Sequence, residues 1–317
     1  MDRVSPMALI GLKKLDYDLY DENGTLLYKS GDELTSEILL SLNYKAVYKE
    51  SQDTSQVENN TLINLTGKEL KSIFPEKTTR LLMSNTRKLV QQAFETNALD
   101  MEICQDTRDI ILNEVYEKAD VFESIGQFRI IDEYTFSHRV NVSALSSALG
   151  LKLNLSENEL KELALGTLLH DVGKLRVPPS ILNKPGKLTP EEFEIIKTHT
   201  TLGYKVVREE MGLAENIALI ALQHQEKYGG GGYPFGLKGN DISYYAQITS
   251  VIDVYDALVS KRVYKEALPS HEALRVLIDE GSKSFNPVLL YKFIYFANYK
   301  NAVDFKIVDR KEQIVSV

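Results

Sequence analysis

Seven residues, Leu168-Leu169-His170-Asp171-Val172-Gly173-Lys174, place an imidazole beside a carboxylate at the end of an apolar helical pattern. Neighbouring side chains on a helix point about 100° apart. The His-Asp pair can therefore share a site either as adjacent ligands of a metal ion, or as an imidazole with its orienting carboxylate. Either arrangement predicts a reaction centre, whereas a single His-Asp pair is also typical of a helix end on the surface.

Four further residues favour the reaction centre. They are His138, His199, His224 and Asp253, and each lies within an apolar helical pattern. Imidazole and carboxylate groups are rarely buried without a partner. One shared metal site accounts for all of them together with the His-Asp pair.

The residues around these candidate ligands predict helices. Ser156-Glu157-Asn158-Glu159 is a capping box for the helix that leads to His170, and Gly173 is expected to stop that helix. Thr189-Pro190-Glu191-Glu192 is a second helix start, and this helix is expected to deliver His199. The four glycines of residues 229–232 predict a loop of unusual conformational freedom that carries Tyr233 on a mobile edge of the site.

The chain divides into three predicted parts. Residues 1–50 alternate as a hairpin around an Asn-Gly turn, followed by a short helix begun by Thr35 and a third strand at 46–48, which predicts a small α/β module. Residues 51–126 are a polar linker and a helical connector. Residues 127–317 are the catalytic domain. The predicted fold class is therefore mainly α, an all-helical bundle with a small N-terminal α/β module.

The role of the connector helices is left open by their pattern. Apolar residues recur near helical spacing from Leu81 to Ile125. These helices either dock on the main domain or pair with another copy of the chain as a homodimer, and the sequence offers no basis for choosing.

Composition narrows the class of protein. Cys104 is the only cysteine, so the chain has no internal disulfide and a thiolate metal cluster is not expected. A net charge of −8 argues against broad binding to nucleic-acid polymers or to anionic membranes. The sequence has no apolar run of about 20 residues and no signal-peptide pattern at its start, so we expect a cytoplasmic protein.

Taken in order, these motifs resemble the HD-GYP family, a branch of the HD metal-dependent phosphohydrolases. The resemblance covers roughly residues 127–298. The motifs that carry it are Asp132-Glu133-Tyr134-Thr135, His138, His170-Asp171-Val172-Gly173-Lys174, Lys184-Pro185-Gly186, His199, Gly232-Tyr233-Pro234 and Asp253.

The resemblance implies an activity and a set of roles. HD-GYP proteins hydrolyse the bacterial messenger cyclic di-GMP to pGpG or GMP with two or three iron or manganese ions. By position, one ion is held by His138, His170, Asp171 and Asp253, and Asp171 bridges to a second ion held by His199 and His224. The residues that match substrate contacts are Lys174, Lys184, Tyr233, Arg262 and Lys265. The Gly-Tyr-Pro loop also implies contact with diguanylate cyclase (GGDEF) domains.

One departure from the family pattern leaves two functions open. Gln225 stands where the family usually has a second histidine, and a neutral amide is a poor ligand for a transition metal. Tyr134 replaces the glutamate of trinuclear members, so two ions rather than three are expected. The chain is then either a phosphodiesterase weakened at its second metal, or a degenerate receptor that binds cyclic di-GMP without turnover. Glu226 and Asp256 either support the ligands or lie on helix surfaces.

Overall fold

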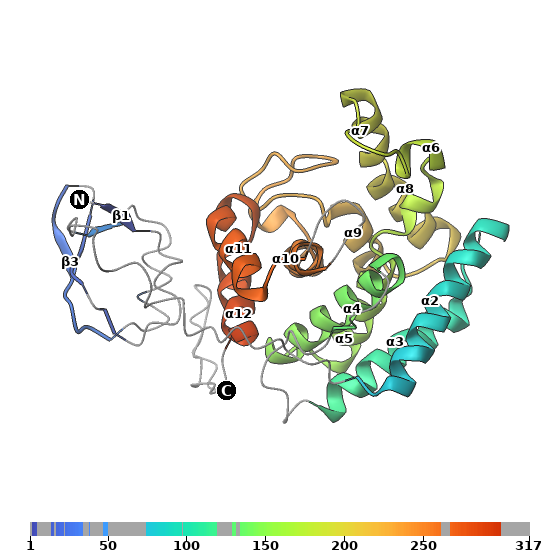
Figure 1. The fold of residues 1–317 in the computed structure, drawn as a ribbon, viewed down its shortest axis with the longest axis horizontal. Coiled ribbons are helices and arrows are strands. Elements are labelled where there is room, and N and C mark those ends of the chain that lie inside the picture. The colour runs from blue at the N-terminus through green and yellow to red at the C-terminus, as the bar shows by residue number, and fades with distance from the viewer. Residues whose placement is uncertain are drawn as a thin grey trace. The chain divides into compact units, whose positions relative to one another are not determined.

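The computed structural model describes residues 2–4, 14–15, 17–21, 23–33, 38, 47–49, 74–96, 98–118, 129–130, 134–260 and 267–298. Contacts between residues divide the chain into two compact units, Met1–Gly67 with Leu290–Val317, and Lys68–Leu289. The predicted fold class is confirmed, because helices dominate the described residues and the strands among these lie in the N-terminal region (Figure 1). The linker at 51–60, the helix expected from Thr35, and both Arg262 and Lys265 lie outside the described residues.

The N-terminal unit contains a four-stranded antiparallel sheet in the order β1-β4-β2-β3. Its strands are β1 (Asp2–Val4), β2 (Leu19–Tyr20), β3 (Leu26–Tyr28) and β4 (Val47–Lys49). The predicted hairpin is confirmed as β2 and β3, whose turn is held by the Asp21 carboxylate accepting from the amides of Asn23 and Thr25. The predicted third strand is β4. Strand β1 was not predicted, because three residues carry too little pattern.

The described helical elements follow in chain order. They are α2 (Glu76–Thr96), α3 (Met101–Glu117), α4 (Tyr134–Lys152), α5 (Glu157–Leu169), the 3₁₀ turn η3 (Val172–Arg176), α6 (Pro179–Leu182), α7 (Pro190–Lys197), α8 (His199–Lys205), the π-helical turn η4 (Val206–Glu210), α9 (Glu215–Gln223), the 3₁₀ turn η5 (Gly239–Asp241), α10 (Tyr244–Val259), α11 (Ser270–Ser284) and α12 (Pro287–Asn298).

Helix α4 is the centre of the helical unit. Residues 140–150 are all buried, and α4 packs against α2, α3, α5 and α10 (Figure 1). Its serines allow this because they are small and bond backbone carbonyls: the Ser143 hydroxyl donates to Ala164 on α5, and the Ser147 hydroxyl donates to Ser143. A helix buried on all sides gives the site a rigid support.

Both predicted capping boxes are confirmed. Ser156 and Glu159 cap α5, and Thr189 and Glu192 cap α7 with Pro190 in the first turn. The expected helix stop at Gly173 is wrong: α5 ends at Leu169, and Gly173 lies inside the tighter turn η3. The chain changes direction here because the next segment must pass directly under the start of α8.

Gly173 is needed for that close approach. A Cβ atom at this position would overlap with the carbonyl oxygen of His199 and the amide nitrogen of Gly203, which are backbone atoms. The single helix expected to deliver His199 is in fact two helices, α7 and α8, which meet at Thr198. Backbone packing of η3 against α8 therefore sets the distance between the His-Asp pair and His199.

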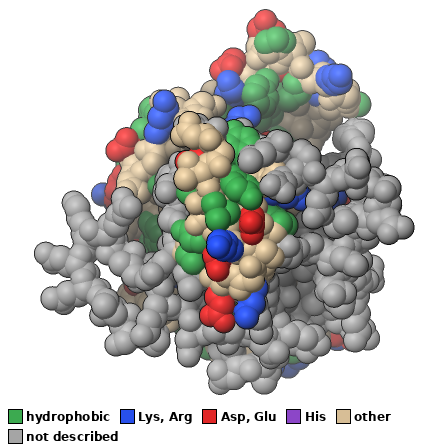
Figure 2. Space-filling view, turned by 90° about the vertical axis from the view of Figure 1, so that its left-hand side faces the viewer, with side chains coloured by type: hydrophobic (Ala, Val, Ile, Leu, Met, Phe, Trp, Pro, Cys, Tyr) green, Lys and Arg blue, Asp and Glu red, His purple; other side chains and the backbone are tan. Residues whose placement is uncertain are grey.

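No helix in the described part of the chain is both long and apolar enough to cross a membrane. One face of the molecule is shown in space-filling form in Figure 2, where acidic and basic side chains are interspersed over the described residues.

Candidate metal centre

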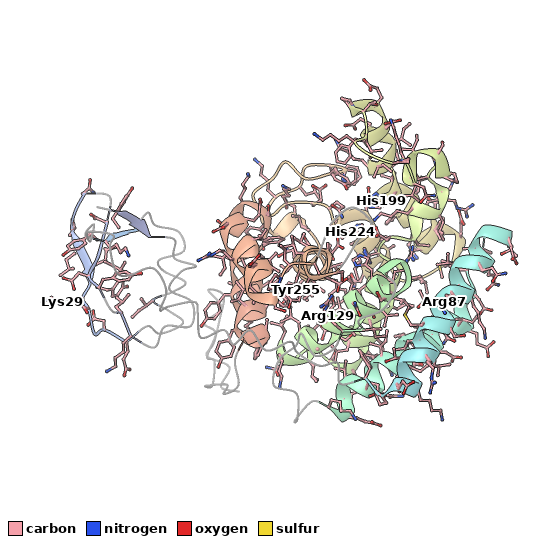
Figure 3. The ribbon with its side chains drawn as sticks, viewed as in Figure 1. Lys29, Arg87, Arg129, His199, His224 and Tyr255 are labelled. Atoms are coloured by element: carbon pink, nitrogen blue, oxygen red, sulfur yellow. The ribbon has the colours of Figure 1, made fainter. Side chains whose placement is uncertain are left out.

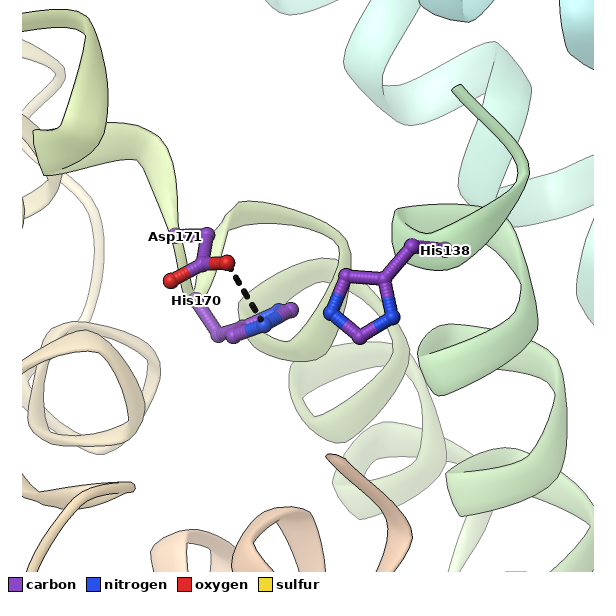
Figure 4. A group of neighbouring side chains, drawn as sticks. All are labelled: His138, His170 and Asp171. Carbon is purple, nitrogen blue, oxygen red and sulfur yellow. Dashed lines mark ion pairs between the residues drawn. The ribbon is translucent and has the colours of Figure 1, made fainter. Parts of the chain in front are cut away.

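His170 and Asp171 lie at the C-terminal end of α5, as the sequence predicted, and face His138 on α4 (Figure 4). The Nδ1 atom of His170 lies 2.7 Å from the carbonyl oxygen of Thr167. A carbonyl can only accept, so Nδ1 carries the proton and Nε2 keeps its lone pair. That Nε2 lies 3.4 Å from Asp171 Oδ2 and has no hydrogen-bond partner among the described residues.

His138 also turns its Nε2 atom into the site, but a carboxylate rather than a backbone carbonyl holds its Nδ1 atom. Its Nδ1 lies 2.8 Å from Asp256 Oδ2, and its Nε2 lies 3.2 Å from Asp253 Oδ1 on α10. A carboxylate behind Nδ1 is the usual arrangement for a histidine that binds a metal through Nε2. Asp253 Oδ1 also lies 3.8 Å from His170 Nε2, so donors from α4, α5 and α10 converge on one point.

His199 and His224 form the other half of the site, at the start of α8 and the end of α9 (Figure 3). The Nδ1 of His199 donates to the Ile196 carbonyl at 2.7 Å, and the Nδ1 of His224 lies 3.1 Å from the Ile220 carbonyl. Their Nε2 atoms face each other at 3.4 Å. Two lone pairs at this distance repel unless a cation lies between or beside them.

Asp171 lies between the two halves. Its Oδ2 is turned to His170, while its Oδ1 lies 3.6 Å from His199 Nε2 and 3.7 Å from His224 Nε2. Oδ1 is buried and has no hydrogen-bond partner among the described residues. The donor atoms form three groups, each within 4.8 Å: His138, His170 and Asp171; His170, His224 and Asp253; and Asp171, His199 and His224. Imidazole and carboxylate donors in adjoining groups fit two divalent ions.

The electrostatics keep most of these groups ready to bind a cation. Burial lowers the pKa of His170, and lowers that of His199 to about 4, so both imidazoles are neutral at pH 7. The pKa values of Asp171 and Asp253 are lowered despite burial, chiefly by the charge of Lys174 at Asp171 and by the hydrogen bond with His138 at Asp253. Both carboxylates are therefore ionised.

His138 differs from the other histidines. Burial opposes its protonation, but hydrogen bonds to Asp253 and Asp256 outweigh burial and raise its pKa to about 9. In the metal-free protein His138 is therefore an imidazolium at neutral pH, and a metal ion must displace its proton.

This difference predicts two pH dependences for metal uptake. The half of the site that contains His138 should bind its metal ion roughly tenfold more tightly for each pH unit from pH 7 to 9, because one proton is released on binding. In the half that contains His199, this histidine should add no pH dependence to metal binding above about pH 5, because its pKa is about 4. Calorimetric Mn²⁺ titrations in buffers of different ionisation enthalpy would measure both; equal slopes for the two ions would contradict the assignment.

Comparison with known proteins identifies the helical unit. A family model described as HD domain matches residues 119–289, more than half of the chain. The chain belongs to the HD-domain family.

Curated relatives place it more closely within that family. A cyclic di-GMP phosphodiesterase of Pseudomonas aeruginosa, PA4108, is 36% identical over 218 residues, covering 68% of this chain and 52% of the relative. A cyclic di-GMP phosphodiesterase of Thermotoga maritima is 37% identical over 181 residues, 57% of this chain and 49% of the relative. A 3'3'-cGAMP-specific phosphodiesterase of Vibrio cholerae is 32% identical over 192 residues, 60% of this chain and 36% of the relative.

The chain spans about half the length of the two cyclic di-GMP relatives and about a third of the third. The structure of Bd1817, an HDG"Y"P protein from Bdellovibrio bacteriovorus, superposes with a TM-score of 0.50 at 22% identity, covering 92% of this chain and 97% of that one, and supports the fold alone. The membership of the HD-GYP branch predicted from the motifs is confirmed.

The predicted substrate residues of the HD domain lie in different surroundings. Lys174 pairs with Asp171 Oδ2 at the edge of the metal centre, and about a third of its side chain is exposed. Lys184 is bound to both carboxylate oxygens of Glu192 at 2.7 Å, so it braces the capping box of α7. Tyr233 lies at the rim, with its ring 6.2 Å from that of His199.

Two residues beside Tyr233 were not found from the sequence. The ring of Phe193 lies 6.4 Å from that of Tyr233, and Lys197 Nζ lies over both rings at 5.1 and 5.8 Å. Both come from α7, four residues apart on one face. Their proximity to the metal centre depends on where α7 packs, which no local pattern encodes.

Glu226 anchors the glycine-rich loop of the HD domain. This buried carboxylate accepts hydrogen bonds from the amides of Phe235, Gly236 and Leu237, at 2.7, 3.1 and 3.0 Å. A Cβ atom at Gly232 would overlap with the backbone at Lys227, so the chain passes close to itself there. The glycines thus permit a tight path, and Glu226 holds the three residues that follow Pro234; the mobility of the edge stays a prediction.

Proposed function

We propose that this chain is a metal-dependent phosphodiesterase that hydrolyses cyclic di-GMP to pGpG or GMP. The observation that carries the proposal is the buried carboxylate of Asp171, whose two oxygens face two different groups of histidines. The names of the relatives support the substrate. Two divalent ions, iron or manganese, would supply Lewis acidity and a nucleophile at neutral pH.

The residues of the chain itself would bind and orient the substrate. Lys174, whose side chain is about a third exposed at the edge of the centre, would offer its ammonium group to a non-bridging phosphate oxygen. Burial, with the charges of Asp171 and Asp253, raises the pKa of the Tyr233 hydroxyl. That hydroxyl therefore keeps its proton and would act as a hydrogen-bond donor beside the phosphate rather than as a base.

The decisive experiment measures metal content and turnover on protein purified without oxygen and supplied with iron or manganese. We expect two ions per chain and conversion of cyclic di-GMP to pGpG or GMP. 3'3'-cGAMP should be assayed in parallel, because relatives of both substrate names match this chain. One ion or none, with the nucleotide bound intact, would contradict the enzyme and support a cyclic di-GMP receptor.

Gln225 is the observation that favours the receptor. Its amide donates to Asp253 Oδ2 at 3.3 Å, so it contacts a candidate ligand without offering a nitrogen lone pair of its own. We expect Gln225→His to increase the affinity for the more weakly bound metal ion by about 10–100-fold and to raise turnover when metal is limiting. Gln225→Ala is the matched control, since it removes the amide without adding a ligand. Unchanged metal affinity and turnover in Gln225→His would rule out a weakened enzyme.

Binding of GGDEF domains by the Gly-Tyr-Pro loop stays a prediction, as do the domain boundaries and a homodimer. The GGDEF contact is supported by the exposed aromatic side chain of Phe235, which follows Tyr233-Pro234 and is 64% exposed. In a pull-down with an isolated GGDEF domain, Tyr233→Ala should retain less than wild type. Equal retention by the variant would count against a contact through this loop.

A further inference from the structure

Asp256 is a completely buried carboxylate of α10 that belongs to none of the three donor groups. Its Oδ2 accepts from His138 Nδ1 at 2.8 Å. Its Oδ1 accepts from Arg129 Nε at 2.9 Å and from Asn141 Nδ2 at 3.2 Å. The two oxygens thus have separate tasks, one toward the metal ligand and one toward the scaffold.

Arg129 extends this contact to the end of α10. The guanidinium, labelled in Figure 3, also donates to the Val259 carbonyl at 3.3 Å and to the Ser260 hydroxyl at 2.8 Å. Only 14% of its side chain is exposed. A planar guanidinium can make these contacts at once, whereas a lysine ammonium could not do so in the same geometry.

The backbone beside Arg129 is fastened to α4. The amide of Ile130 donates to Asn141 Oδ1 at 2.7 Å, and Asn141 Nδ2 donates to the Ile130 carbonyl at 3.1 Å. Asn141 lies three residues after His138, on the same face of α4. The entry to the catalytic domain, the metal ligand and the end of α10 are therefore joined through one buried network.

Burying a carboxylate without a countercharge costs free energy of folding. A countercharge that is hydrogen-bonded to the carboxylate offsets this cost and holds the group in one geometry. Arg129 neutralises Asp256 and fixes its plane. Asp256 in turn fixes the ring of His138, so that Nε2 faces Asp253 at 3.2 Å. Without the Asp256 oxygen, the His138 ring could rotate about its Cβ–Cγ bond, and Nε2 would lose its direction.

We propose that Arg129 and Asp256 are a pair of positioning residues that set the affinity of the metal ion held by His138. The proposal rests on the proposed function in one respect, that metal binds at this site.

The test is a calorimetric Mn²⁺ titration of the chelator-treated 317-residue chain. Asp256→Asn and Arg129→Lys should each lower the affinity for one of the two metal ions by about 10–100-fold and leave the affinity for the other unchanged. Arg108→Lys is the matched control, because the Arg108 side chain is 17% exposed and its guanidinium is paired with Asp109 at 2.7 Å, outside the donor groups. It should bind both ions like wild type.

A second measurement separates positioning from folding. At saturating Mn²⁺ the turnover of Asp256→Asn and Arg129→Lys should return toward wild type, which a loss of folded protein would not allow. Unchanged affinity for both ions, or equal weakening of both, would overturn the positioning role. If wild type itself binds no metal, the proposed function fails as well; if wild type binds two ions and the variants match it, only the positioning role fails.

Discussion

Asp171→Asn is expected to remove the activity of this protein while leaving its helices folded. Among the described residues, the Asp171 carboxylate has one oxygen toward His170 and the other toward His199 and His224. An amide in its place keeps the shape but removes the negative charge, and it turns NH₂ hydrogens toward metal-binding nitrogens. We expect turnover of cyclic di-GMP to fall at least on the order of 1000-fold.

The measurement is turnover together with metal content and circular dichroism. Glu210→Gln is the control, because it also removes a paired carboxylate, bound to Arg176 at 2.8 Å, but at a position outside the donor groups. Its turnover should equal that of wild type. An Asp171→Asn protein that keeps two ions and more than a tenth of the wild-type turnover would show that no shared carboxylate is needed.

Gly173→Ala should have the second largest effect, on stability and on the second metal together. The added methyl group would overlap with the His199 carbonyl and the Gly203 amide, and backbone atoms cannot rotate away as a side chain can. The start of α8 must therefore shift and take His199 with it. We expect a loss of about 2–3 kcal/mol of unfolding free energy, and weaker binding of the ion that His199 holds.

Denaturant unfolding and Mn²⁺ titration would measure the two effects. Gly166→Ala on α5 is the control, since its methyl group would meet the end of the Ile220 side chain, which can change rotamer. It adds a methyl group to the buried core around Ile220, so it should cost about 1 kcal/mol, less than Gly173→Ala, and leave metal binding intact. Equal stability of the two variants would contradict the close backbone contact between η3 and α8.

Features encoded by neighbouring residues were predictable from the sequence. The capping boxes at Ser156 and Thr189 form as expected, because each side chain bonds an amide three residues away. The hairpin of β2 and β3 forms around Asp21 for the same reason. The His-Asp pair lies at the end of α5 because the apolar pattern ends there.

Features that depend on distant residues were not predictable. Lys184 pairs with Glu192, and Glu226 accepts hydrogen bonds from the glycine-rich loop. Asp256 forms an ion pair with Arg129, 127 positions away in the chain. Nothing local distinguishes these charged residues from solvated ones. The break between α7 and α8 likewise follows from the packing of α8 on η3, and not from a residue that ends helices.

The sequence by itself therefore indicated which side chains are candidate metal ligands, since residue type and order are sufficient for that. The tertiary structure decided how those atoms are presented. The hydrogen bonds at Nδ1 turn the Nε2 atoms of the four site histidines inward, and the crossing of α4, α5, α8, α9 and α10 brings donors to opposite sides of one carboxylate. These are contacts across the core, and only the packed chain contains them.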